Sequence, residues 1–69
     1  MLFRSEVPAG WIGKSVGELD IRRKYGINIL GIKRSGKTDV SITPDTVLAK
    51  DITILALGEY KALQRCFRI

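Results

Sequence analysis

SVGELDIRRKYGINILGIKR, residues Ser15–Arg34, is the stretch that decides the predicted fold. Its first half predicts a short helix that begins at Ser15. Ser15 and Glu18 have the S-x-x-E spacing of a capping box, in which each side chain accepts a hydrogen bond from the backbone N–H of the other residue. Gly26 is a typical helix stop, because glycine readily adopts the left-handed conformation. The predicted helix therefore ends where the second half of the stretch begins.

The second half, Ile27–Arg34, predicts a strand with an unusual distribution of apolar residues. A strand with one face in water alternates apolar and polar residues, whereas this one is apolar on both faces. In so small a chain one face covers the core, so the other face requires a second subunit, a ligand or both. The predicted faces are Asn28, Leu30 and Ile32 on one side and Ile27, Ile29 and Gly31 on the other.

The positive charge of the chain is concentrated around this stretch. Twelve Lys and Arg residues outnumber seven acids, which gives a net charge of +5. Seven of the twelve bases lie between Lys14 and Lys37, where Glu18 and Asp20 are the only acids. This distribution favours an anionic partner without identifying the anion. The alternative is a solvated basic face that has no partner.

The rest of the chain predicts three more strands and one more helix. Ser35-Gly36 separates two strand-like segments and predicts a hairpin. Thr43-Pro44-Asp45 predicts a turn, because proline presets the backbone for the second turn position. The order strand, helix, three strands, helix is typical of an α+β fold, here a small antiparallel sheet with two short helices. The additional elements are strands Leu2–Val7, Lys37–Ile42 and Ile52–Leu57 and a helix Glu59–Phe67.

Length and composition indicate that the domain needs support beyond its own core. Residues 1–69 are expected to form a single domain, and chains of about 60 residues bury only about 60% of the surface they expose when unfolded. With one cysteine and no histidine, the chain can form neither an internal disulfide nor a zinc site. A homodimer is therefore the expected support. No apolar run reaches the length of a membrane span and no signal peptide is evident, which predicts a cytoplasmic location.

The sequence offers no catalytic constellation, and we interpret the chain as a non-enzyme. Without histidine, general-base chemistry would fall to scattered acids, and the glycines match neither a P-loop nor a dinucleotide-binding motif. Ser15 is better explained as the helix cap than as a nucleophile. Cys66 is expected to be a structural thiol, buried with Leu63 and Phe67 against the sheet. Trp11, on the loop after the first strand, is expected to fill a core or an interface.

Two blocks of the sequence carry a more specific pattern: GKSVGELDIRRKYGINILGIKR, residues 13–34, and SITPDTVLAKDITILALGE, residues 41–59. A short helix ends in L-x-I-R-x-x-Y-G and is followed by an apolar strand, a hairpin, a proline turn and a second apolar strand before the last helix. In this order the features resemble the carboxy-terminal lobe of RCK domains, the TrkA-C family. The resemblance spans Val7 to Phe67 and departs at Lys50-Asp51, where the family usually has Gly-Asp.

The resemblance implies a regulatory role in transport. RCK domains regulate bacterial cation channels and transporters, notably potassium uptake systems of the Trk and Ktr type. Their amino-terminal Rossmann lobe binds nucleotides such as NAD or ATP and is missing from this chain. The carboxy-terminal lobe pairs with itself, and in several members the groove between two copies binds cyclic di-AMP. The implied partners are a second copy and a membrane cation channel or transporter subunit, reached directly or through a Rossmann lobe at the inner face of the membrane.

The resemblance also implies roles for individual residues. In cyclic di-AMP-binding members the arginine of the I-R pair contacts phosphate, and Arg22 holds that position here. The asparagine that helps to hold the base corresponds to Asn28, the turn proline corresponds to Pro44, and a position that is often alanine is Gly31. In an ideal strand Gly31 shares the groove face with Ile29, whereas Asn28 points away from it. No cofactor is implied beyond cyclic di-AMP as a regulatory ligand. The residues implied to flank the adenines are Val16, Ile21 and Ile29.

Two other interpretations use the same features. A dimerisation module that binds no ligand would share all the core features of the cyclic di-AMP-binding domain. The two interpretations differ only in the roles that they give to Arg22 and Asn28. A nucleic-acid-binding domain suits the basic charge, but single-strand binders expose aromatic residues on the sheet, and here the aromatic residues are dispersed. We therefore expect no nucleic-acid partner. Comparison of Arg22→Ala with Arg68→Ala is the charge-matched test that the sequence suggests.

Overall fold

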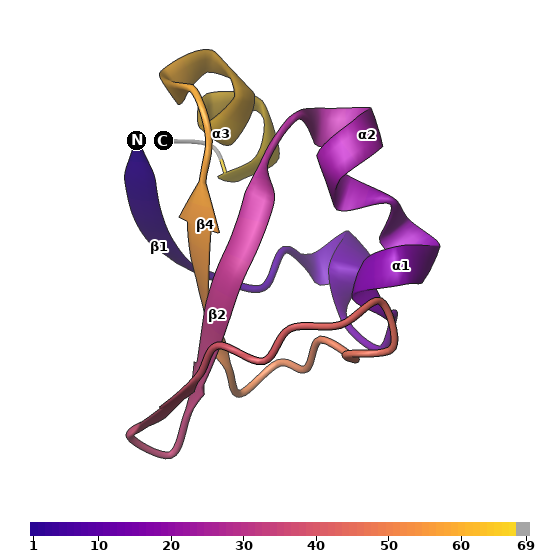
Figure 1. The fold of residues 1–69 in the computed structure, drawn as a ribbon, viewed down its shortest axis with the longest axis vertical. Helices are drawn as coiled ribbons and strands as arrows, with labels where there is room; N and C mark the ends of the chain where they lie inside the picture. The colour runs from indigo at the N-terminus through magenta and orange to yellow at the C-terminus, as the bar shows by residue number, and fades with distance from the viewer. Residues whose placement is uncertain (68–69) are drawn as a thin grey trace.

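The computed structural model describes residues 1–67 and shows a four-stranded antiparallel sheet with short helices packed against one face (Figure 1). The strand order is β1-β4-β2-β3, so β4 and β2 form the centre of the sheet. The predicted α+β architecture and the order of its elements are confirmed. The elements are β1 (Leu2–Glu6), the 3-10 helix η1 (Ala9–Trp11), α1 (Val16–Leu19), α2 (Ile21–Tyr25), β2 (Asn28–Arg34), β3 (Lys37–Asp39), β4 (Thr53–Leu57) and α3 (Tyr60–Phe67).

The register of the sheet separates a covered face from an open face. Phe3 of β1 and Ile29 of β2 both pair with Ala56 of β4, and directly paired residues point to the same face. Ala56 is fully buried, and Phe3 contacts Phe67 of α3, so this face is the one that the helices cover. The opposite face carries Leu2, Arg4 and Glu6 from β1, Thr53, Leu55 and Leu57 from β4, and Asn28, Gly31 and Lys33 from β2.

A β-bulge in β2 changes which side chains share a face. The pairing with β4 skips Leu30, which is an extra residue between Ile29 and Gly31. Beyond a bulge the alternation of side chains is shifted by one residue. Ile29 therefore points to the same face as Ile32, and Gly31 points to the face of Asn28. The prediction that Ile29 and Gly31 share a face is wrong, because it assumes an unbroken alternation along the strand.

The helical segment predicted to begin at Ser15 is divided into α1 and α2. Asp20, between them, adopts a left-handed conformation with φ 51° and ψ 46°, which Asp tolerates better than most non-glycine residues. The predicted capping box is confirmed: the Glu18 N–H donates to the Ser15 hydroxyl (3.1 Å), and the Ser15 N–H donates to the Glu18 carboxylate (3.2 Å). Gly26 ends α2 with φ 72°, as predicted.

The hairpin formed by β2 and β3 projects from the body of the domain (Figure 1). Ser35 and Gly36 both have positive φ, 52° and 80°, as a two-residue type I′ turn requires. The predicted hairpin is confirmed, although β3 ends at Asp39 and is shorter than expected. Because β3 pairs only with residues 32–34, residues 28–30 leave a free edge of β2 within the described part of the chain.

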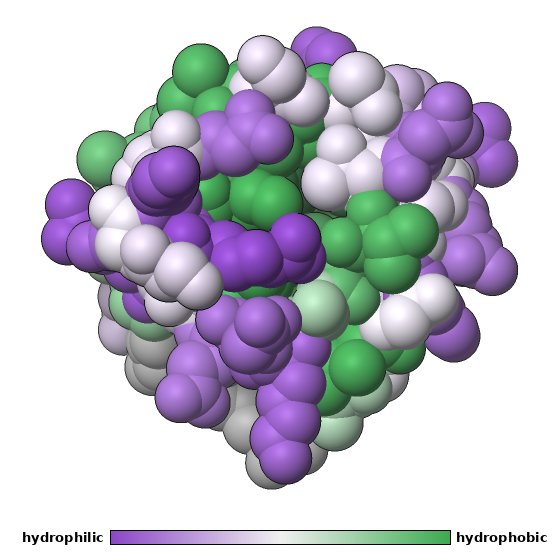
Figure 2. Space-filling model, turned by 90° about the horizontal axis from the view of Figure 1, so that it is seen from below, coloured by the Kyte–Doolittle hydropathy of each residue, from purple (hydrophilic) through white to green (hydrophobic). Residues whose placement is uncertain are grey.

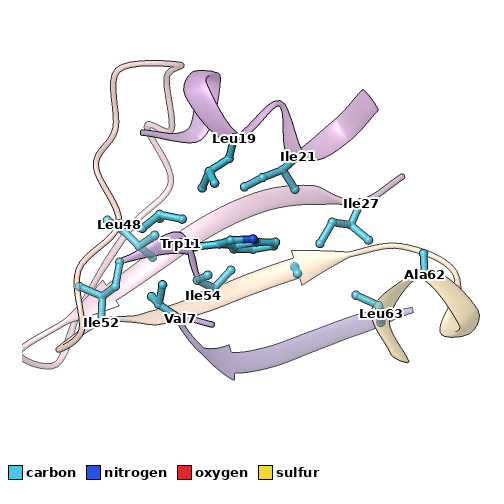
Figure 3. Close-up of a cluster of buried hydrophobic side chains, with 12 residues drawn as sticks. Val7, Trp11, Leu19, Ile21, Ile27, Leu48, Ile52, Ile54, Ala62 and Leu63 are labelled. Atoms are coloured by element: carbon cyan, nitrogen blue, oxygen red, sulfur yellow. The ribbon is translucent and has the colours of Figure 1, made fainter. Parts of the chain in front are cut away.

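Buried side chains from the sheet and the helices meet around Trp11 (Figure 3). Leu19 and Ile21 point from α1 and α2 toward this residue, whose ring lies 5.5 Å from that of Tyr25 and 5.7 Å from that of Phe67. The side chain of Trp11 is 6% exposed, which confirms its predicted place in the core. The buried cluster comprises Val7, Trp11, Leu19, Ile21, Ile27, Ile32, Leu48, Ile52, Ile54, Ala56, Ala62 and Leu63.

Cys66 on α3 is half-buried and packs against this core. It is less enclosed than we predicted, whereas its neighbour Leu63 is fully buried. Burial raises the pKa of the Cys66 thiol, and the positive charge of Arg65 opposes this effect. The thiol therefore remains protonated at neutral pH.

Some apolar side chains remain outside the core. Val40 is 70% exposed and Leu2 is 56% exposed. Viewed from the end where the hairpin projects, hydrophobic side chains reach the surface between hydrophilic ones (Figure 2). None of the helices within residues 1–67 combines the length and the apolar composition needed to cross a membrane.

Candidate functional site

An open groove lies beside the free edge of β2, between α1–α2 and the turn after β3. We call it the Arg22 groove. Its volume is about 310 Å³, at the small end of the range of about 300–1,000 Å³ that is typical of ligand pockets. It is lined by Val16, Gly17, Ile21, Arg22, Ile27, Asn28, Ile29, Ile42, Thr43 and Pro44.

The first wall of the groove is formed by α1 and α2. The capping box fixes where α1 begins, and the break at Asp20 sets the direction of α2. Because of this break, Ile21 is buried in the core with 2% of its side chain exposed, while the next residue, Arg22, lies in the solvent at the rim. The sequence I-R thus places one apolar and one cationic side chain on the same wall.

The second wall is the turn at Pro44, which is attached to α1 through the backbone. The Gly17 N–H donates to the Pro44 carbonyl (2.8 Å), and the Val16 N–H donates to the Thr46 carbonyl (2.9 Å). The turn itself is closed by the Thr46 N–H, which donates to the Thr43 carbonyl (3.0 Å), so the predicted turn is confirmed. These bonds hold the turn and the amino-terminal end of α1 at a fixed separation.

Glycine at position 17 is required by the close approach of these two walls. A Cβ atom on Gly17 would lie 2.8 Å from the Pro44 Cβ and 3.0 Å from the Pro44 carbonyl oxygen. The proline ring and the backbone oxygen are both rigid, so a larger residue would displace the turn. Gly17 therefore sets the position of Pro44 and, with it, the width of the groove.

The floor of the groove is apolar. Ile27 is fully buried, and Ile29 and Ile42 are half-buried and pack against the core. Since β3 ends at Asp39, no strand within residues 1–67 covers this part of β2. The floor is consequently open to a flat apolar group from another molecule.

The rim of the groove is cationic and polar. Arg22 is its one cation, Asn28 and Thr43 are its other polar side chains, and no Asp or Glu lines it. The single ion pair among residues 1–67 joins Arg23 to Asp20 (3.0 Å), so Arg22 has no carboxylate partner there. An unpaired guanidinium beside an apolar floor is suited to a phosphate that carries an apolar ring system.

The structure brings together six of the seven residues that the sequence suggested for a ligand site. Gly31 is the exception: it lies on the open face of the sheet, where a Cβ atom would lie 3.1 Å from the Asp39 carbonyl oxygen and 3.5 Å from Val40 Cγ1. The bulge at Leu30 turns it away from the groove. Asn28 lies at the rim although it points away from the face of Ile29, because it stands at the end of the strand. The six lining residues are Val16, Ile21, Arg22, Asn28, Ile29 and Pro44.

Four residues of the groove could not be identified as site residues from the sequence. Gly17 and Thr43 are the chain neighbours of Val16 and Pro44, and their adjacency to predicted site residues is the signal that points to them. Ile27 is likewise the chain neighbour of Asn28, whereas Ile42 is next to no predicted site residue. An apolar residue next to a turn is also equally suited to the core. The described residues contain no group of three His, Cys, Asp or Glu side chains arranged to hold a metal ion.

Comparison with known proteins assigns the chain to a family. A family model described as the TrkA-C domain matches residues 2–69. The chain belongs to the TrkA-C domain family. This TrkA-C domain is similar to the uncharacterized transporter YfbS of Escherichia coli (strain K12), with 42% identity over 53 residues that cover 75% of this chain and 8% of that protein. The chain therefore spans a small part of the length of this relative.

Two solved structures resemble the TrkA-C domain closely. One is the RCK C domain of the potassium transport protein KtrA in complex with cyclic di-AMP, with a TM-score of 0.84, 31% identity and coverage of 93% of this chain and 75% of that chain. The other is an RCK_C domain dimer of S. agalactiae BusR in complex with cyclic di-AMP. Its TM-score is 0.83 and its identity is 29%, with coverage of 93% of this chain and 87% of that chain. BusR is also solved with its busAB-promotor DNA, in a chain of which this domain covers 35%, with a TM-score of 0.82 and 26% identity.

Proposed function

We propose that this TrkA-C domain is a non-catalytic regulatory module of a potassium or other cation transport system, and that it binds cyclic di-AMP in the Arg22 groove at the interface of a homodimer. The observation that carries the proposal is Arg22, an exposed cation with no carboxylate partner among residues 1–67, at the rim of an apolar groove without acids. The KtrA and BusR domains, which share this fold, are solved in complex with the same ligand.

The chemistry of the ligand suits the composition of the groove. Cyclic di-AMP has two phosphates and two adenines related by approximate two-fold symmetry. One phosphate can accept charge-assisted hydrogen bonds from Arg22. One adenine can lie between Val16 and Ile21 of the first wall and Ile29 of the floor, and Asn28 can donate to and accept from the base edge. Pro44 bounds the adenine from the opposite wall.

A single groove offers only half of what the ligand needs. Its one cation and one floor match one phosphate and one adenine, and its volume is about 310 Å³. A two-fold dimer presents the same surface twice and would supply the second Arg22. We therefore propose that a second copy completes the site, and that the dimer connects at the inner face of the membrane to a channel or transporter subunit, directly or through a Rossmann lobe.

Calorimetric titration of the domain with cyclic di-AMP tests this proposal, with cyclic di-GMP and AMP as control ligands. Removal of a charge-assisted hydrogen bond to phosphate costs about 1.5–3 kcal/mol, so Arg22→Ala should weaken binding roughly 10- to 100-fold. Arg23→Ala is the matched control, because it removes the same charge from the same helix at a side chain that is 87% exposed and outside the groove. Arg68, the control suggested by the sequence, lies outside the described residues.

The outcome of the titration separates the candidate functions. Selective loss of affinity in Arg22→Ala supports the ligand site. Equal weakening in Arg22→Ala and Arg23→Ala would mean that net charge alone holds the ligand. No heat at high micromolar cyclic di-AMP would overturn the proposal in favour of a ligand-free dimerisation module.

Nucleic-acid binding is the second candidate, because the chain carries a net charge of +5 and the relative BusR is solved with DNA. Phosphate-backbone contacts weaken steeply with salt, whereas an apolar floor contributes affinity that salt changes little. Retention of a DNA duplex by the isolated domain at about 50 mM salt, with loss at about 200 mM, would favour this candidate.

A further inference from the structure

A second hollow, on the open face of the sheet, is not used by the proposed function. We call it the Arg4–Lys33 hollow. It has a volume of about 180 Å³ and shares no lining residue with the Arg22 groove. It is lined by Arg4, Ile32, Lys33, Thr38, Thr53, Ile54 and Leu55.

The register of the sheet directs two cations toward this hollow from opposite sides. Lys33 pairs with Thr38 on one side and with Thr53 on the other, so these three residues form a row across β3, β2 and β4, which Glu6 of β1 extends as the other partner of Thr53. Arg4 pairs with Leu55 in the adjacent row, on the far side of β4. With strands about 4.8 Å apart, the Cα atoms of Arg4 and Lys33 are separated by about 12 Å. Two long side chains can converge over β4 from that separation.

The polar side chains of the hollow are all hydrogen-bond donors. Arg4 and Lys33 have no acceptor atoms, and the hydroxyls of Thr38 and Thr53 can each donate. No Asp or Glu lines the hollow. Neither cation takes part in the single ion pair found among residues 1–67. Glu6 stands beside Thr53 on the same face but does not line the hollow, and the two positive charges of the lining outnumber its single negative charge, so the lining is complementary to an anion.

The size of the hollow limits which anion it can hold. A volume of about 180 Å³ is a little more than half that of the Arg22 groove, about 310 Å³, so the hollow suits a smaller ligand than that groove does. This space accepts an ion of a few heavy atoms and is too small for a dinucleotide. Leu55 provides an apolar floor between the two cations and excludes water from one side of the ion.

We propose that the Arg4–Lys33 hollow binds a small oxyanion, with phosphate as the representative ligand. Arg4 and Lys33 supply the charge, and Thr38 and Thr53 donate hydrogen bonds to the remaining oxygens. The hollow is independent of the Arg22 groove, so its occupation does not require cyclic di-AMP. An open site with two exposed cations binds weakly, in the millimolar range of concentration.

Titration of the ¹⁵N-labelled domain with sodium phosphate tests the proposal, with sodium chloride added to keep the ionic strength constant. We expect saturable amide shifts concentrated at Lys33, Thr38, Thr53 and Leu55. Exposed ion pairs contribute little individually, so Arg4→Gln or Lys33→Gln should each weaken phosphate binding about threefold, and the double variant about tenfold. Arg34→Gln removes the same charge from the next residue of β2, which points to the other face of the strand, and should leave binding unchanged.

The proposal is overturned if the shifts grow linearly without saturation, or if they spread equally over Arg22, Arg34 and Lys61. Equal weakening by Arg34→Gln and Lys33→Gln would also overturn it, because net charge would then explain the binding. All four variants change exposed side chains, and unaltered amide spectra in the absence of phosphate would establish that each is folded. Cyclic di-AMP affinity should be the same in the double variant and the unmodified domain, which separates this test from that of the proposed function.

Discussion

Substitution of Gly17 by alanine tests the contact that sets the width of the Arg22 groove. The new Cβ would lie 2.8 Å from the Pro44 Cβ and 3.0 Å from the Pro44 carbonyl oxygen, so the turn must move. Overpacking of this kind costs about 1–3 kcal/mol. Alanine regains up to about 1 kcal/mol through its better helix propensity and its more restricted unfolded state. With the full gain, the net loss in the free energy of unfolding is about 0–2 kcal/mol, whereas a glycine-to-alanine change without a clash should be neutral or stabilising.

The assay is thermal unfolding at fixed protein concentration, followed by circular dichroism. For a domain of this size 1 kcal/mol corresponds to about 4–8 °C in Tm, so Gly17→Ala should lower Tm by up to about 16 °C. Gly10→Ala is the matched control, because a Cβ there meets no atom within 4 Å. A Gly17→Ala domain as stable as Gly10→Ala would refute the contact with Pro44. Because displacement of Pro44 also changes the groove, Gly17→Ala should weaken cyclic di-AMP binding while Gly10→Ala does not.

Three further predictions follow from the core and the helices. Ser15→Ala removes the capping box and should lower the free energy of unfolding in urea by about 1 kcal/mol; an unchanged midpoint would contradict the cap. Ile54→Val shortens a fully buried side chain and should cost about 0.5–1.5 kcal/mol in the same assay, whereas a neutral effect would show that the site relaxes. The folded-state pKa of Cys66 is raised above 9.0, so its contribution to stability is complete below that pH and is lost as pH rises through the folded pKa. The stability difference between the unmodified domain and Cys66→Ala should therefore shrink above about pH 9, and a pH-independent difference would exclude this effect.

Structural features that depend only on residues close together in the sequence could be predicted from the sequence. Ser15 and Glu18 form the capping box because both partners lie within one helical turn. Ser35 and Gly36 form the hairpin turn because their left-handed conformations suffice to reverse the chain.

Features that depend on contacts distant in sequence could not be predicted in the same way. The bulge at Leu30 exists only in relation to β4. Gly31 beside it is a residue type that often accompanies bulges, but it does not fix where the extra residue lies. Because of this bulge, Gly31 points to the open face of the sheet and does not line the Arg22 groove. The left-handed Asp20 separates Leu19 and Ile21, which are both buried in one core although, two residues apart on a continuous helix, they would not face the same side. Gly17 looks like a weak helix residue in sequence, and its role appears only once Pro44 is placed against it.

The stoichiometry of cyclic di-AMP binding tests the central claim most directly. If each Arg22 groove is half of a site that a second copy completes, calorimetric titration should give about 0.5 ligand per chain. Sedimentation of the same sample should show a dimer when the ligand is saturating. One ligand per chain on a sedimenting monomer, or no binding at high micromolar ligand, would contradict the shared site.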